Sequence, residues 1–186
     1  MSEKRAAALV LLEQNIRNPK MIAHCLASEA VMQRIAIHFG QDPETWGLCG
    51  LLHDIDVEVT NADPQTHGTL AGKILEPLSL PAEVIEAIEM HNEMSSSEPR
   101  SAILHHALAA GETITGLIFA TAMVYPDKKI SSVKAKSVVK RMKEKMFAAS
   151  VKRENITECE LIGIPIGDFA QMALEALIPI EKELGF

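Results

Sequence analysis

Four histidines and two carboxylates occupy positions where helical spacing would turn them toward a protein core. The stripe of His24, for example, also holds Val31 and Ile35, and the others lie on similar apolar stripes. An unpaired buried polar group costs about 1–3 kcal/mol, so burying all six without a shared purpose would be strongly unfavourable. Imidazole nitrogens and carboxylate oxygens both ligate divalent metals. The set therefore predicts a metal site made of His24, His53, Asp54, His67, His91 and Glu112.

The pair His53–Asp54 closes an apolar run that begins at Gly47. A carboxylate beside an imidazole at the end of a buried helix is costly unless something compensates its charge. A single core-facing histidine is more often a structural residue with a satisfied hydrogen bond. Four such histidines together with two carboxylates favour the metal site over that structural alternative.

Taken in order, these six residues resemble the ligand pattern of the HD superfamily of metal-dependent phosphohydrolases. The resemblance runs from about residue 20 to residue 125. The histidine at position 67 makes the chain similar to the two-metal members, which include bacterial diadenosine tetraphosphatases and cyclic-dinucleotide phosphodiesterases. The segments Leu51–Ile55 and Thr113–Leu117 resemble a subgroup known as predicted HD hydrolases.

The resemblance implies one or two divalent transition-metal ions, for which iron, manganese and zinc all suit the ligand set. His24, His53, Asp54 and the acid at 112 would hold the first ion. Asp54 would bridge to a second ion held by His67 and His91. His53 and Asp54 are the implied catalytic residues, and a metal-activated water would hydrolyse a small phosphate ester or nucleotide, as a phosphomonoesterase or a phosphodiesterase.

Glu112 departs from the superfamily pattern, which has aspartate at this position. The additional methylene moves the carboxylate outward by roughly 1 Å, so that it could bind a metal differently or through water. Gly111 could supply the backbone room that this requires. His105, two turns earlier on the same stripe, is a possible substitute ligand.

The composition predicts an all-α protein with a sizeable core. Of the 186 residues, 47% are hydrophobic and 4% are aromatic, which suits packed helices better than a β-sandwich. We expect one domain over residues 1–186, a bundle of about seven to nine helices. The metal-site core would cover about 20–125, and the basic and C-terminal helices in 126–186 would pack on it.

Asn18–Pro19, Asp42–Pro43 and Asp63–Pro64 each offer an N-cap followed by proline at the first helical position. Gly40 would end the first of these helices. Predicted helices cover residues 19–39, 43–54, 64–77, 81–91, 100–124, 133–147 and 167–184, the last bent by Pro179, with a short capped turn at 157–160.

Charge is distributed unevenly along the chain. Eight basic residues and one acid lie between Lys128 and Lys145, although the whole chain has a net charge of −7. The predicted helix 133–147 would place Lys136, Lys140 and Lys143 along one flank of its apolar face. These lysines could be solvated, could bind the phosphate of a substrate, or could bind nucleic acid or a membrane surface. We select phosphate binding as the functional prediction.

No apolar stretch is expected to reach membrane-spanning length, and the N-terminus lacks the apolar region of a secretory signal. Cys25, Cys49 and Cys159 are interpreted as reduced core thiols. We therefore expect a cytoplasmic protein with a small phosphorylated substrate, no membrane and no nucleic acid partner, and we predict no oligomeric state. Two alternatives stay open: a non-catalytic HD-like signalling or scaffold module, and a nucleic-acid-associated factor that uses the basic helix.

Overall fold

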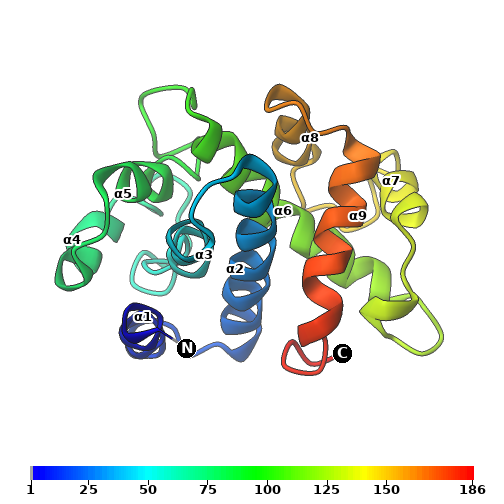
Figure 1. The fold of residues 1–186 in the computed structure, drawn as a ribbon, viewed down its shortest axis with the longest axis horizontal. Helices are drawn as coiled ribbons and strands as arrows, with labels where there is room; N and C mark the ends of the chain where they lie inside the picture. Colours follow the sequence, from blue (N-terminus) through cyan, green and yellow to red (C-terminus); the bar gives the residue numbers. More distant parts are fainter. Residues whose placement is uncertain (1) are drawn as a thin grey trace.

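The computed structural model describes residues 2–186, and within them every regular element is helical (Figure 1). This confirms the all-α prediction and the expected number of helices. In chain order the elements are α1 (Glu3–Asn15), α2 (Pro19–Phe39), α3 (Pro43–Leu52), α4 (Ala71–Leu75), η1 (Glu76–Leu78), α5 (Ala82–Glu89), α6 (Ile103–Met123), η2 (Ile130–Ser132), α7 (Ala135–Met142), α8 (Arg153–Leu161), α9 (Ile166–Leu177) and η3 (Ile178–Ile180).

Two of the three predicted start signals begin helices as expected. The Asn18 side chain accepts the N–H of Lys20 at 3.0 Å, and the Asp42 side chain accepts the N–H of Thr45 at 2.9 Å. Gly40 ends α2 in the left-handed conformation with φ 64°, a region that favours glycine. Local capping chemistry thus sets both ends of the helix that carries His24.

The third signal, at Asp63, starts a turn segment instead of a helix. Residues 64–70 form consecutive turns, and α4 begins only at Ala71. Gly68 has φ 99°, which is incompatible with a continuous helix, and the buried Asp56 carboxylate accepts the N–H groups of Gly68 and Leu70. The predicted helix 64–77 is therefore wrong over its first half, because a side chain replaces the helical hydrogen bonds.

Helices α2 and α3 approach each other closely through small residues. A Cβ atom at Gly50 would lie 2.5 Å from the carbonyl oxygen of Ser28, and one at Gly47 would lie 2.7 Å from the Gln33 side chain. Glycine at these positions permits a helix separation that a larger residue would prevent. The close packing brings the C-terminal end of α3 beside the His24 turn of α2.

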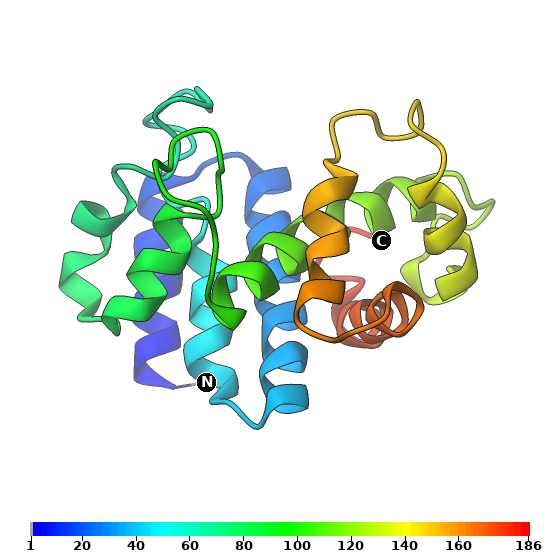
Figure 2. The ribbon, with the colours of Figure 1, turned by 90° about the horizontal axis from the view of Figure 1, so that it is seen from above.

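Helix α6 runs between the α1–α5 group and the α7–α9 group (Figure 2). It packs against α2, α5, α7, α8 and α9. It is also long and apolar enough to cross a membrane, contrary to the sequence expectation, but 67% of it is buried inside the domain. That burial is typical of the central core helix of a folded domain.

The sequence interpretation was least accurate outside the central helices. Helix α1 was not among the predicted helices, and nine residues form α8 where a short turn was expected at 157–160. Helix α7 ends at Met142 rather than at 147, and Met146, which falls outside it, is 89% exposed. Pro179 lies in η3, where α9 gives way to a tighter turn.

Candidate metal centre

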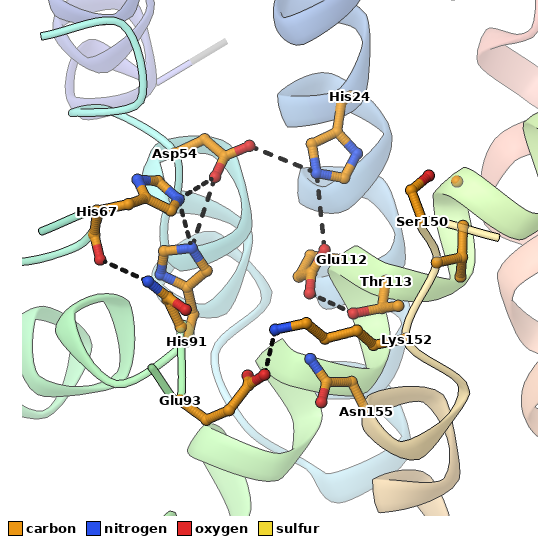
Figure 3. A pocket seen from close by; sticks show the side chains of 13 residues that line it. His24, Asp54, His67, His91, Glu93, Glu112, Thr113, Ser150, Lys152 and Asn155 are labelled. Carbon is orange, nitrogen blue, oxygen red and sulfur yellow. Dashed lines mark hydrogen bonds and ion pairs between the residues drawn. The ribbon is translucent and has the colours of Figure 1, made fainter. Parts of the chain in front are cut away.

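The structure brings together all six predicted ligand residues from five separate parts of the chain (Figure 3). His24 lies on α2, His53 and Asp54 follow the end of α3, and Glu112 lies on α6. His67 and His91 lie in the segments before α4 and after α5. Nε2 of His24 is 3.1 Å from Nε2 of His53, and Nε2 of His67 is 3.0 Å from Nε2 of His91.

The Asp54 carboxylate lies between two groups of imidazoles. Its Oδ2 is 3.6 Å from Nε2 of His24 and 3.4 Å from Nε2 of His53. Its Oδ1 is 2.9 Å from Nε2 of His67 and 3.5 Å from Nε2 of His91. One carboxylate oxygen thus faces each group, which is the arrangement that a bridge between two ions needs.

The other ring nitrogen of each histidine is occupied by a protein acceptor. Nδ1 of His53 donates to the carbonyl of Gly50 at 2.8 Å, and Nδ1 of His91 donates to the carbonyl of Ile88 at 2.6 Å. Nδ1 of His24 lies 2.9 Å from the hydroxyl of Thr115. Such contacts fix the tautomer with the proton on Nδ1 and leave the lone pair of Nε2 directed at the centre. The donor set and its orientation therefore fit a divalent metal.

Asp56 is the residue that accepts the Nδ1 hydrogen of His67. Its side chain is 0% exposed, and Oδ1 accepts from Nδ1 of His67 at 2.8 Å while the two oxygens accept backbone N–H groups of the following turn. Asn92 also fixes the position of this residue, because its Nδ2 donates a hydrogen bond to the carbonyl of His67 at 3.0 Å. Its burial and these contacts identify Asp56 as a residue that orients His67.

Glu112 reaches the centre from the opposite helix. Its Oε2 is 3.7 Å from Nε2 of His24, and its Oε1 accepts a hydrogen bond from the hydroxyl of Thr113. Gly111 allows α6 to approach α2, since a Cβ there would lie 3.0 Å from the sulfur of Met32. The longer side chain at 112 is thus accommodated, and His24, His53 and Glu112 form one potential ligand group.

His105, the possible substitute ligand, lies elsewhere. Its Nδ1 accepts the backbone N–H groups of Ser101 and Ala102, each at 3.4 Å, so it caps the start of α6. It does not line the cavity. Cys25 was interpreted as a core thiol, and it is buried and free. Its sulfur, however, also lies within 4.8 Å of potential ligand atoms of His53 and Asp54.

Burial and neighbouring charges act in opposite directions across the cluster. Burial, and then His53, lower the pKa of His24 to about 4. Burial also raises the pKa of Glu112 to about 7. Burial alone would raise the pKa of Asp54, but the surrounding histidines hold it well below its ordinary value. Burial lowers the pKa of His67, but its hydrogen bonds to Asp54 and Asp56 raise it to about 9, so a metal ion that binds this ring would displace a proton from it.

A cavity of about 280 Å³ opens onto this cluster. Its wall is formed by His24, Asp54, His67, His91, Asn92, Glu93, Glu112, Thr113, Gly116, Ser150, Val151, Lys152 and Asn155. The C-terminal part of the chain therefore contributes through the segment before α8 and the first turn of that helix. No pattern in the sequence singled out the C-terminal residues of the wall, which are Ser150, Val151, Lys152 and Asn155.

The three lysines predicted to bind substrate are not part of this wall. Lys136 and Lys140 are exposed on α7, and Lys143 is its C-terminal cap. The cationic side chain that lines the cavity is instead Lys152, whose Nζ is paired with Oε1 of Glu93. The three lysines lie outside the wall because α7 ends at Met142 and packs on α6 and α9, and the later segment that holds Lys152 reaches the cavity instead. Their role in substrate binding stays a prediction.

Arg100 is a second residue that the sequence did not reveal. Its side chain is 9% exposed, and Nη1 donates to the carbonyls of Met90 and His91 at 3.1 and 2.9 Å. Nη2 donates to Oε1 of Glu158 at 2.6 Å and to Oδ1 of Asn155 at 3.3 Å. One guanidinium therefore joins the segment that carries a candidate ligand to α8.

Comparison with known proteins identifies one family. A family model described as the HD domain matches residues 21–123, which is more than half of the chain. The match covers all six residues of the cluster and ends at the last residue of α6. No curated protein and no solved structure matches the chain.

Proposed function

The chain belongs to the HD domain family, and on that premise we propose that it is a metal-dependent phosphohydrolase that acts on a small phosphate ester. The position of Asp54, with one carboxylate oxygen facing each pair of imidazoles, is the observation that carries the proposal. It supports a centre for two divalent ions in which Asp54 is the shared ligand.

His24, His53, Asp54 and Glu112 would hold one ion, and Asp54, His67 and His91 would hold the other. Divalent ions bound in this way supply an activated water as the nucleophile and positive charge for the phosphoryl oxygens. The set does not select among iron, manganese and zinc, since all three accept imidazole and carboxylate ligands.

The protein itself prepares the ligands before any substrate arrives. Asp56 and the carbonyls of Gly50 and Ile88 hold the protons on the Nδ1 atoms of their histidines, so each Nε2 presents a lone pair inward. Burial keeps bulk water from competing for these groups, since His53 is 1% exposed and His91 is 6% exposed. Pre-positioned ligands lower the reorganisation that the reaction requires.

The cavity favours a compact substrate over a nucleotide. Its volume of about 280 Å³ lies just below the range of roughly 300–1,000 Å³ for small-molecule sites. Apart from the histidines, which would be held by the metal ions, no aromatic side chain lines it within residues 2–186, so a nucleobase would find no further ring to stack on. The polar lining instead suits a small phosphate ester with further polar groups.

Metal analysis followed by a substrate screen tests the proposal. We expect one or two transition-metal ions per chain, and turnover of small phosphomonoesters or phosphodiesters with Mn²⁺. Asp54→Asn, which keeps the size of the side chain, serves as the inactive control. Bound metal without turnover of any phosphate ester would favour the non-catalytic scaffold alternative, and absence of metal uptake at micromolar Mn²⁺, Fe²⁺ or Zn²⁺ would contradict the metal centre itself.

A further inference from the structure

The first turn of α8 forms the part of the cavity wall that lies across from His67 and His91 (Figure 3). No side chain caps this nine-residue helix. In the described part of the chain, the backbone N–H groups of residues 153–155 have no acceptor. A helix N-terminus with unsatisfied N–H groups favours a negative charge, but it requires further groups to become a specific site.

Asn155 supplies one such group. Its side chain is buried, with 8% exposed, and its Oδ1 accepts from Nη2 of Arg100 at 3.3 Å. Arginine can only donate, so this contact fixes the orientation of the amide. The NH₂ group has no acceptor within residues 2–186, and Figure 3 shows it on the side of the cavity where Lys152 and Glu112 lie. A side chain that is 8% exposed thus holds an unpartnered donor toward the cavity.

Lys152 supplies the positive charge. It is the N-cap residue of α8, and its Nζ is paired with the Glu93 carboxylate across the mouth of the cavity. Glu93 also lies 3.7 Å from Nη1 of Arg100. A carboxylate of the protein therefore already occupies the place beside Lys152 that the oxyanion of a ligand could take. The pair is half exposed on both sides, so the exchange of one anion for another would cost little.

The backbone before α8 is fixed in place. The Arg153 guanidinium donates to the carbonyls of Ala148 and Val151 at 2.7 and 2.6 Å, and also to that of Phe147. Val151 packs against Gly116 on α6, where a Cβ would lie 3.3 Å from its Cγ2. The N–H groups, Lys152 and Asn155 are thus held in one arrangement before a ligand binds, which lowers the entropy that binding loses.

From this wall we infer an anion subsite, made by the first turn of α8 with Lys152 and Asn155, that binds a second oxyanion of the substrate. The inference rests on the proposed function, because the metal cluster would hold the phosphate that is hydrolysed. The substrate class is then a small phosphate ester with a phosphate or a carboxylate at its other end. Both groups offer the same oxygen acceptors to N–H donors and to an ammonium group.

Binding of inorganic phosphate to the metal-free protein tests the subsite without catalysis. We would titrate EDTA-treated protein by calorimetry at pH 8. Lys152→Gln should weaken binding about three- to tenfold. Asn155→Asp, which keeps the acceptor for Arg100 and replaces the NH₂ with an oxygen, should weaken it at least as much. Glu93→Gln should strengthen it by about two- to fivefold, because it removes the competing carboxylate.

Lys136→Gln is the matched control, because Lys136 is an exposed lysine that does not line the cavity. It should change the affinity by less than twofold. No phosphate binding by the metal-free protein, or equal losses in the Lys136 and Lys152 variants, would overturn the subsite. Weaker phosphate binding by the Glu93→Gln variant would also overturn the subsite, because removal of a competing carboxylate must strengthen binding.

Turnover by the Mn²⁺-loaded protein then tests the substrate class. Ethyl phosphate, phosphoglycolate and ethane-1,2-diyl bisphosphate share a two-carbon frame and differ in the second oxyanion. We expect a KM at least tenfold lower for one or both doubly anionic compounds, and Lys152→Gln should raise the KM for these alone. Equal KM values would overturn this inference and leave the phosphohydrolase proposal intact. Phosphate binding at the subsite without turnover of any phosphate ester would support the subsite and contradict the phosphohydrolase proposal.

Discussion

The cavity has two walls of different construction. The wall from residues 24–112 contains imidazoles and carboxylates that are largely buried, and its histidines are held by second contacts such as that of Asp56 with His67. The wall from residues 150–155 consists of a half-exposed lysine, an uncapped helix and one buried amide. The first wall is built to keep several ligands at short distances, whereas the second offers donors whose partners can change.

This difference predicts how substitutions on each wall should behave. Removal of a buried group leaves its partners unsatisfied and costs about 1–3 kcal/mol, and in a metal site it also removes a bond to the ion. Changes in an exposed ion pair are worth about 0.2–1 kcal/mol. Variants of the first wall should therefore alter metal content, whereas variants of the second should alter affinity for anions.

Asp54→Ala should have the largest effect. Asp54 is the one residue of the cluster with an oxygen toward both groups of imidazoles, so both ions should be lost together with all hydrolase activity. Elemental analysis after gel filtration measures this. The exposed Asp168 provides the control, because Asp168→Ala should retain the metal content. Retention of a full complement of ions by the Asp54 variant would exclude Asp54 as the shared ligand.

His67→Ala should remove one ion and leave the other. The ring contacts Asp54 and His91 but not the group formed by His24, His53 and Glu112. The metal content should fall from two ions to one, with a large loss of activity. His38→Ala, at an exposed position, should change neither quantity. If two ions and full activity persist in the His67 variant, a single-metal centre is the better description.

The first wall was largely predictable from the sequence. His24 shares an apolar stripe with Val31 and Ile35, and all three lie on the buried side of α2. Periodicity carries this information because a helix repeats regularly, and the prolines and glycines that bound α2 and α3 mark where it starts and stops. His67 was predicted both from a similar stripe and from the resemblance to the HD superfamily, but residues 64–70 form turns, so helical periodicity does not explain its place in the cluster.

The second wall depends on contacts between residues far apart in sequence. Lys152 lines the cavity because Arg153 binds three loop carbonyls and Val151 packs on Gly116, and none of these contacts leaves a periodic pattern. The lysines of α7 do follow such a pattern, with Val138 buried and Lys136 exposed. That pattern specifies only which face of the helix is buried, so it could not identify the lysine that reaches the cavity.

Asp56→Asn should have an intermediate effect. An amide cannot accept from His67, Gly68 and Leu70 together as the carboxylate does, so the ring should lose its fixed orientation. Loss of such an orienting contact weakens metal binding about 10–100-fold. We expect this loss for one of two ions in a calorimetric titration with Mn²⁺. An unchanged affinity would show that Asn92 and the packing of the turn are sufficient to orient His67.

Glu58→Gln is the control for that experiment. Glu58 lies two positions after Asp56 and also accepts two backbone N–H groups, those of Arg17 and Asn18, each at 2.8 Å. It is not part of the cavity wall. Its substitution should alter local stability by a few tenths of a kcal/mol to about 1 kcal/mol and leave both metal affinities as they are.

The smallest effect is expected from the triple change of Lys136, Lys140 and Lys143 to Gln. These side chains are exposed and do not line the cavity, so metal content and KM should change by less than twofold. The free energy of unfolding should change by no more than about 0.5 kcal/mol. Lys152→Gln alone should raise KM more than all three together, which distinguishes a direct contact from general positive charge.

A suitable control is Lys134, the N-cap residue of α7, changed together with Lys145 in the turn segment after this helix, both exposed. Arg141 must be left unchanged, because its guanidinium lies 4.2 Å from the ring centroid of Phe147, in the loop that leads to the second wall. If both sets of variants raise KM equally and the effect disappears at high salt, the segment 128–145 attracts the substrate at long range. A KM increase that persists at high salt and is confined to the triple variant would instead show that α7 contacts the substrate directly, contrary to the position of its lysines outside the cavity wall.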